Sequence, residues 1–239
     1  MKILLYLFCW LLFSLSAFCQ SAMVQAAFRA AAVPKATATS LPTPDIYTQD
    51  FEGGTLPVGW TVINGTPIWN YSPAILGSYS LNLVDTGNVY VAYSGASEVY
   101  VQLSVELMAL PAAGYQIAVL KNIAGGAVQG YIFVTSLGKL DMYDVGFAHE
   151  KVTVAAMSAG TTYFLWIHYK AGTGSNALLT GAFSASNSEP TSGNYFVSIA
   201  NSTSTGANGY MSFGQTAATG VASIIDHLGI ATFAMPTGW

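Results

Sequence analysis

The sequence predicts an all-β domain built as an antiparallel β-sandwich. From Ile46 onward, short apolar runs are separated by Gly, Asn, Ser and Pro at intervals of roughly 8 to 15 residues, which is typical of sandwiches. Apolar and polar residues alternate strictly within several of these runs. No helix of useful length competes, because the best candidate, 218–228, is interrupted by Gly220 and is rich in β-branched residues.

The chain opens with the pattern of a secretory leader. Residues 1–21 begin with Lys2, continue through an apolar core and end in small residues, as signal peptides do. A membrane anchor is the alternative, but the apolar core at 3–15 is shorter than the roughly 20 residues that cross a bilayer. Both cysteines, Cys9 and Cys19, lie in this leader, so the mature chain is expected to fold without disulfides. The sequence therefore predicts a protein that is secreted, extracellular or at the cell surface, with no transmembrane anchor.

A flexible linker is predicted after the leader. Residues 22–44 are rich in Ala, Pro and Thr and show no sustained period of 2 or 3.6. The folded domain is then expected to occupy residues 45–239, as a single unit.

Two strands of the domain are predicted most clearly. Between Glu98 and Ala109 the odd positions are apolar and most even positions are polar, which indicates a half-buried antiparallel strand. A second strand is predicted over 162–170, with Tyr163 and Leu165 on the face opposite Trp166. Leu137-Gly138 is the expected turn of a hairpin. Further strands are expected at 115–120, 131–136, 139–143, 195–200, 210–214, 222–225 and 228–233.

The even face of strand 162–170 is the candidate ligand site. Aromatic rings with hydrogen-bond donors beside them suit sugars, whose CH groups stack on rings while their hydroxyls take hydrogen bonds. The alternative is that this face is the inner, core face, because strand parity defines two faces without saying which one points inward. The candidate ligand-binding residues are Phe164, Trp166, His168, Lys170, Tyr100 and Gln102.

The charge of the chain excludes nucleic acid as a partner. Seven Lys and Arg stand against 11 Asp and Glu, for a net charge of -4, and Arg29 is the single arginine. Neutralising a phosphate backbone needs clustered cations, which this composition does not supply.

Four segments resemble a known family. The chain resembles the concanavalin A-like, laminin G-type jelly rolls of secreted lectins, adhesins and carbohydrate-binding modules, and its start is most similar to bacterial adhesin-type members. The resemblance implies a jelly-roll β-sandwich that covers residues 50–230. The segments that carry it are Asp50–Trp60 (DFEGGTLPVGW), Gly77–Leu83 (GSYSLNL), Thr161–Tyr169 (TTYFLWIHY) and Ile224–Ile230 (IIDHLGI).

The resemblance also implies a structural calcium ion, which many such jelly rolls hold between an early Glu and a late Asp. Glu52 and Asp226 occupy the matching positions. His227 stands where a second acid is usual, so Asp50 or Asp85 is expected to supply the missing oxygen. The alternative is that Glu52 and Asp226 are ordinary acids at the ends of strands.

No catalytic residue is predicted. The chain has no Gly-x-Ser-x-Gly elbow and no His-Glu-x-x-His motif. Glycoside hydrolysis needs two carboxylates across the scissile bond, and the hydrolase relatives' Glu-x-Asp-x-x-Glu strand is absent. The close acid pairs are Asp50 with Glu52 and Asp141 with Asp144, and the odd spacing of the second pair sends its members to opposite faces.

The sequence therefore favours a secreted, non-catalytic carbohydrate-binding or adhesion module, whose partner is an extracellular glycan or a cell-surface protein. The alternative is a structural, self-assembling surface protein, because 8% charged residues give little electrostatic repulsion between copies. A glycan hydrolase or lyase is the least favoured function.

Overall fold

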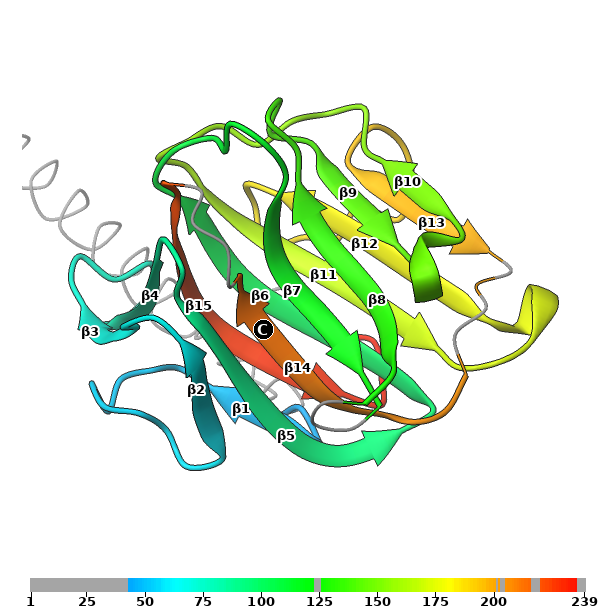
Figure 1. The fold of residues 1–239 in the computed structure, drawn as a ribbon, viewed down its shortest axis with the longest axis horizontal. Helices are drawn as coiled ribbons and strands as arrows, with labels where there is room; N and C mark the ends of the chain where they lie inside the picture. Colours follow the sequence, from blue (N-terminus) through cyan, green and yellow to red (C-terminus); the bar gives the residue numbers. More distant parts are fainter. Residues whose placement is uncertain (1–42, 123–125, 201, 203–204, 216–219, 236–239) are drawn as a thin grey trace, which may run out of the picture. The chain divides into compact units, whose positions relative to one another are not determined.

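The computed structural model describes residues 43–122, 126–200, 202, 205–215 and 220–235. In these residues the chain forms two antiparallel sheets and no α-helix, so the predicted all-β sandwich is confirmed. Figure 1 shows the two sheets as stacked layers, with β5, β7, β8 and β14 in front of β6, β11, β12 and β15. The leader at 1–21 and the linker up to residue 42 lie outside the described residues. No helix in the described part of the chain is long and apolar enough to cross a membrane.

The first sheet, sheet A, has eight strands, with β1 paired to the C-terminal half of β15. In spatial order it contains β13 (Phe196–Ala200), β12 (Leu178–Ser184), β11 (Thr162–Lys170), β6 (Glu98–Leu107), β15 (Ala222–Ala231), β4 (Ser80–Val84) and β3 (Ile68–Tyr71), together with β1 (Tyr47–Gln49).

The second sheet, sheet B, has seven strands. In spatial order it contains β10 (Glu150–Val152), β9 (Leu140–Tyr143), β8 (Val128–Val134), β7 (Tyr115–Lys121), β14 (Asn208–Gly214), β5 (Asn88–Ala96) and β2 (Trp60–Asn64). Two single-turn 3-10 helices, η1 (Val145–Phe147) and η2 (Gly174–Asn176), connect strands.

The core lies between the sheets and decides which strand faces point inward. The odd residues of β6 from Val99 to Leu107 are at most 2% exposed, and so are Leu165, Ile167 and Tyr169 of β11. They pack in one apolar cluster with residues of sheet B such as Ile117 and Phe213. The even residues of β6 and β11 therefore lie on the outer face of sheet A, and the alternative that they form the core face is wrong.

The predicted strand 162–170 is confirmed as β11, with both of its ends correct. β6 begins at Glu98, as predicted. At the C-terminal end, the two predicted strands 222–225 and 228–233 are one strand, β15. A bulge between Asp226 and Gly229 interrupts its pairing with β6, and His227 takes a left-handed φ of 47° there. A bulge inserts residues without ending a strand, which explains why the alternation breaks at this point while the strand continues.

Aromatic side chains close the end of the sandwich near β2. Trp60 is 5% exposed, and its ring stacks on Phe213 at 5.6 Å and meets Phe51 edge-on at 5.4 Å. Phe51 is 1% exposed, with a left-handed φ of 59°. Phe51 and Trp60 thus anchor the two ends of the Asp50–Trp60 segment in the core.

Candidate functional site

The predicted ligand face lies on the outside of sheet A. The antiparallel register places Trp166 opposite Gln102 and His168 opposite Tyr100. Phe164 and Lys170 occupy the same face of β11, because residues two apart on a strand point the same way. The structure thus brings the six predicted residues together on one surface.

The middle of this surface is covered. Trp166 is only 5% exposed and Gln102 only 1% exposed. The amide Nε2 of Gln102 donates to Oδ1 of Asn187 at 2.7 Å, and Asn187 belongs to the segment that follows β12. Phe164 and Lys170, toward the two ends of β11, keep more of their surface in solvent. Access to a ligand is therefore greatest at the ends of this face.

His168 is part of a hydrogen-bonded cluster on the same face. Its Nε2 lies 2.9 Å from Oε1 of Glu98, and its ring stacks on Tyr100 with centroids 4.0 Å apart. Lys170 Nζ lies 3.7 Å from the other oxygen of Glu98. Burial lowers the pKa of His168 below its ordinary value, and the contact with Glu98 offsets this only in part. The imidazole is therefore held largely neutral near pH 7.

Glu52 and Asp226, the predicted calcium ligands, both bind the segment before β4. The Glu52 carboxylate accepts hydrogen bonds from the backbone N–H groups of Ser78 and Tyr79 at 2.8 to 3.2 Å. Oδ2 of Asp226 accepts from the backbone N–H of Leu76 at 2.9 Å. It also accepts from the hydroxyl of Ser80, at 2.8 Å. The two acids act together as a clamp that holds residues 76–80.

This clamp bears on the calcium prediction. Oδ1 of Asp226 accepts the N–H of His227, so all four oxygens of the two carboxylates face N–H or O–H donors. Asp50 accepts the N–H of Glu52, and Asp85 accepts the N–H of Gly220. A calcium ion needs six to eight oxygens directed at it. These oxygens point at protein donors and are not directed at one common point. In the described residues, no group of three or more His, Cys, Asp or Glu is placed to hold a metal ion. Calcium binding stays a prediction.

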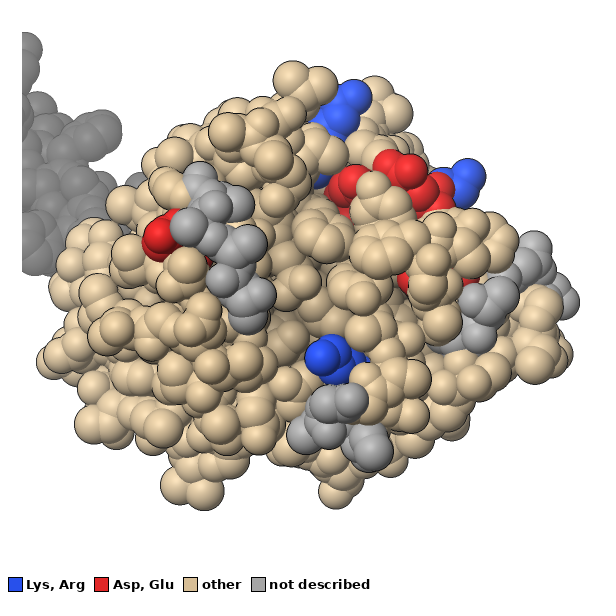
Figure 2. Space-filling view, in the orientation of Figure 1, with Lys and Arg blue, Asp and Glu red and all other residues tan. Residues whose placement is uncertain are grey.

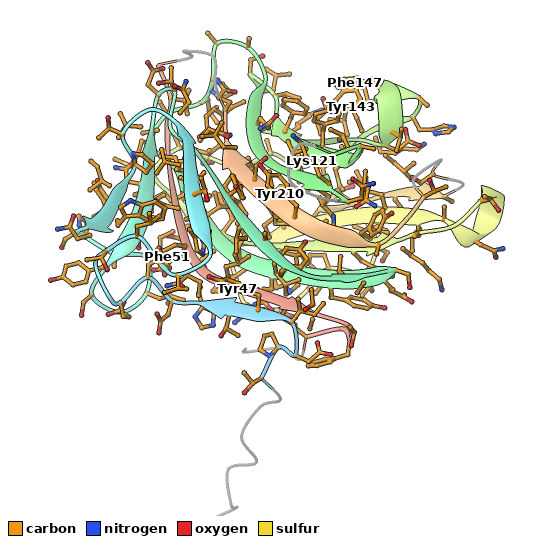
Figure 3. All side chains as sticks on the ribbon, turned by 60° about the horizontal axis from the view of Figure 1, so that its bottom comes forward. Tyr47, Phe51, Lys121, Tyr143, Phe147 and Tyr210 are labelled. Carbon is orange, nitrogen blue, oxygen red and sulfur yellow. The ribbon has the colours of Figure 1, made fainter. Side chains whose placement is uncertain are left out.

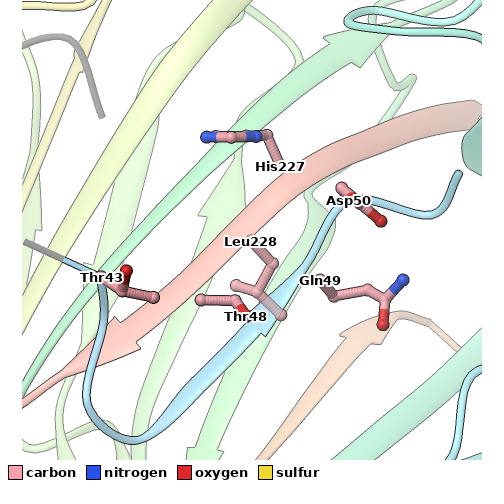
Figure 4. Close-up of a pocket in the computed structure, with 6 residues that line it drawn as sticks. All are labelled: Thr43, Thr48, Gln49, Asp50, His227 and Leu228. Atoms are coloured by element: carbon pink, nitrogen blue, oxygen red, sulfur yellow. The ribbon is translucent and has the colours of Figure 1, made fainter. Parts of the chain in front are cut away.

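Asp50 and His227 also line a small polar cleft between β1 and β15. Figure 4 shows its walls, with Thr48 and Gln49 on β1 and with His227 and Leu228 on β15. The cleft has a volume of about 290 Å³, and the imidazole of His227 is the one ring among its described lining residues. It lacks the Phe, Tyr or Trp surface on which sugar rings commonly stack.

A larger groove lies on the outer face of sheet B, where no ligand site was predicted. Its volume is about 400 Å³, within the roughly 300 to 1,000 Å³ of small-ligand sites. Figure 2, which looks onto this face, shows it hollowed near the centre. The lining residues come from β7, β8, β14 and the neighbouring strands, and they are Ile63, Asn88, Gln116, Val119, Lys121, Val128, Tyr131, Phe133, Ser212 and Gln215.

Amide side chains form the polar part of the groove. Gln116 Nε2 donates to the carbonyl oxygen of Gly214 at 2.6 Å, and Gln215 Oε1 accepts the backbone N–H of Gln116 at 3.1 Å. Asn88 Nδ2 donates to the carbonyl oxygens of Phe213 and Gly214 at 3.1 and 2.8 Å. These bonds fix the side chains in place before any ligand arrives, which lowers the entropic cost of binding.

Aromatic rings form the opposite part of the groove. Tyr131 and Phe133, both on β8, are half-buried, with ring centroids 5.9 Å apart. Phe147 of η1 stacks on Tyr131 at 4.6 Å and meets Tyr143 edge-on at 5.1 Å. Figure 3 shows Tyr143 and Phe147 side by side at the end of the sandwich that carries η1. The rings extend the apolar surface from the groove toward β9.

An acidic rim lies beyond these rings. The Tyr143 hydroxyl lies 2.9 Å from Asp141 and 3.0 Å from Glu150, which is exposed on β10. Burial raises the pKa of Asp141, which is 7% exposed. Asp144 is fully buried and accepts a hydrogen bond from His149. Asp144 lies just after β9, at the start of η1, so the two acids have different partners and the predicted placement on opposite faces of one strand does not apply.

Sequence reasoning missed this groove for a physical reason. Its walls combine residues far apart in the chain, such as Gln116 with Gln215, and the pairing of β7 with β8 shifts register twice. Each shift changes which residues share a face, so alternation does not reveal the outer set. The one available signal is the pair Tyr131 and Phe133, two aromatic residues at strand spacing.

Comparisons with known proteins identify the fold and no family. No protein-family model and no curated protein matches the chain. Among solved structures, a mutant of the alginate lyase Aly36B in complex with alginate trisaccharide matches 80% of this chain and 100% of its own, with a TM-score of 0.51 and 12% identity. The binding domain of botulinum neurotoxin DC is similar to 74% of this chain, with a TM-score of 0.50, both in complex with SialylT (13% identity) and with rat synaptotagmin II (12%).

The alignment covers 44% of each neurotoxin chain. At these identities the likeness shows the fold alone, a β-sandwich compatible with the predicted lectin-like jelly roll. The proteins that share it include polysaccharide lyases and toxin binding domains.

Replacing Gly77 by Ala tests the clamp. Gly77 has a φ of 66°, and an added Cβ would lie 2.1 Å from Oε1 of Glu52. The substitution therefore strains the backbone and displaces the carboxylate from Ser78 and Tyr79, so we expect the free energy of unfolding to fall by about 1 to 3 kcal/mol in urea denaturation. Gly160→Ala is the matched control, because Gly160 has the same left-handed φ of 66° and its Cβ would meet nothing within 4 Å. Equal losses in the two variants would contradict the clamp.

The neutral state of His168 predicts a pH-dependent stability. Its pKa is lower in the folded state than in the unfolded state, so the folded state binds fewer protons and loses stability as pH falls through about 6.5 and below. Glu98, Lys170 and Tyr100 surround the imidazole and stay in place in a His168→Gln variant. We expect this variant to show a shallower loss of unfolding free energy between about pH 7.5 and 5. An unchanged slope would show that His168 does not contribute.

Proposed function

We propose that this protein is a non-catalytic module that binds an extracellular polysaccharide in the groove on the outer face of sheet B. The observation that carries the proposal is the composition of that groove. Half-buried Tyr131 and Phe133 stand against fixed amides from Gln116 and Asn88, in a hollow of about 400 Å³.

This combination suits a sugar ring better than it suits an apolar ligand. The faces of pyranose rings carry CH groups that pack on aromatic rings, and their equatorial hydroxyls need donors and acceptors at the edge. Ser212 supplies a hydroxyl and Lys121 an ammonium group to the lining. An apolar ligand would cover these two groups without offering either of them a hydrogen bond, at a cost for each.

The groove's titratable groups favour binding over hydrolysis. Of the described residues that line it, none is an acid or a histidine. Hydrolysis of a glycosidic bond uses two carboxylates about 5 to 9.5 Å apart. Asp141 and Glu150, beyond the rings, both lie within hydrogen-bond distance of the Tyr143 hydroxyl, and burial keeps Asp141 away from solvent.

The extracellular location and the glycan partner expected from the sequence are part of this proposal. A leader followed by a flexible linker fits a module that is exported. An extracellular glycan is then the partner, and the outer face of sheet A is the competing surface for the same ligand.

Replacing Phe133 by Ala tests the location of the site. Loss of the ring removes the stacking surface, so we expect the affinity for the best glycan on a neutral and acidic array to fall about tenfold, or 1.4 kcal/mol. Phe164→Ala is the matched control, because Phe164 is a half-buried aromatic residue on the outer face of the other sheet. Near-ultraviolet circular dichroism establishes that both variants are folded. If Phe164→Ala then weakens binding and Phe133→Ala does not, the site lies on sheet A.

A further inference from the structure

A single cation lines the groove on the outer face of sheet B in the part of the chain that the structure describes. Lys121 is the one charged side chain among the described residues that line the groove. The three ion pairs in the described part of the chain involve other residues, so Lys121 has no carboxylate partner there. Its Nζ lies 5.5 Å from the centre of the Tyr210 ring, and Figure 3 shows the two side chains next to each other.

Tyr210 gives this ammonium group a defined position. The ring is 3% exposed and packs on Tyr90 with centroids 4.5 Å apart, so it is a rigid platform. A cation over an aromatic face is attracted to it without being neutralised. The ammonium group is therefore held beside the groove, where it favours an anion.

The acids lie on the other side of the aromatic rings. Asp141, Glu150 and Asp144 come from β9, β10 and the turn between them, whereas Lys121 ends β7. Figure 2 shows acidic side chains gathered over the β9 and β10 side of this face with basic side chains beside them, and one further basic side chain near the centre. Exposed Lys151 on β10 lies next to Glu150 in the chain, so the acids of this side have a cation of their own, whereas Lys121 has none of these acids as a partner.

We infer that the groove takes an anionic polysaccharide, whose carboxylate or sulfate group pairs with Lys121 while an uncharged part of the sugar lies along Tyr131 and Phe133. This inference rests on the proposed function and adds the class of glycan. Lys121 is the one cation among the described residues that line the groove, and it determines which glycan fits. A glycan without an anion leaves its ammonium group without a carboxylate or sulfate partner when the ligand excludes water from it.

The test measures binding by calorimetry with matched ligands. The probes are oligosaccharides of galacturonate, glucuronate and mannuronate, the methyl ester of each, and a neutral glucan with its sulfated form. We expect the free acids or the sulfated glucan to bind at least about tenfold more tightly than their uncharged counterparts, and to lose affinity as salt is raised.

Variants of Lys121 then assign the effect. Lys121→Gln is expected to weaken binding of the anionic ligand about tenfold or more, and Lys121→Arg to keep it within about threefold. Lys151→Gln, which removes an exposed cation on β10 outside the groove, is the control and should bind as the wild type does. Thermal unfolding of each variant establishes that it is folded.

The outcomes separate this inference from the function on which it rests. Tighter binding of uncharged glycans, or anion binding unchanged in Lys121→Gln, overturns the inference and leaves polysaccharide binding in place. Binding of no glycan overturns both. Release of an unsaturated product from a uronate ligand, seen by its ultraviolet absorbance, supports the inference and replaces the non-catalytic part of the proposed function.

Discussion

The packing of two alternating strand faces against each other is the constraint on which the rest of this structure depends. β6 and β11 pair over nine positions in sheet A, from Thr162 with Glu106 to Lys170 with Glu98, and their odd residues form the floor of the core. A shift of one residue would expose this apolar set and bury the polar set, so the register is strongly fixed. This register therefore determines which side chains of β6 and β11 lie on the outer face of sheet A and which pack against sheet B.

The outer faces of the two sheets differ in whether their polar side chains and neighbouring segments cover them. On sheet A, polar side chains satisfy one another, as His168 and Lys170 do with Glu98, and the segment after β12 covers the centre. On sheet B, fixed amides and the half-buried rings of Tyr131 and Phe133 line a hollow. The Glu52 and Asp226 clamp stabilises the β4 end of the sandwich without facing this hollow, so we assign it a structural role and assign recognition to sheet B.

Sequence patterns predict the parts of this fold that depend on local alternation. The ends of β11, the start of β6 and the shared face of Phe164, Trp166 and His168 all follow from period-two spacing. The patterns fail at Asp226, where a bulge joins two expected strands into one. They do not reveal the groove, because Gln116 and Gln215 are brought together by strand pairing over about a hundred residues of chain, which a single sequence does not encode locally.

The most direct test of the account is an amide and side-chain NMR titration of the protein with its best-binding oligosaccharide. The account predicts that the largest shifts fall on the side-chain amide of Gln116 and the backbone of Ser212 and Tyr131, all of which line the groove. Shifts concentrated on Phe164 and His168, with the groove residues unchanged, would contradict it and place recognition on the outer face of sheet A.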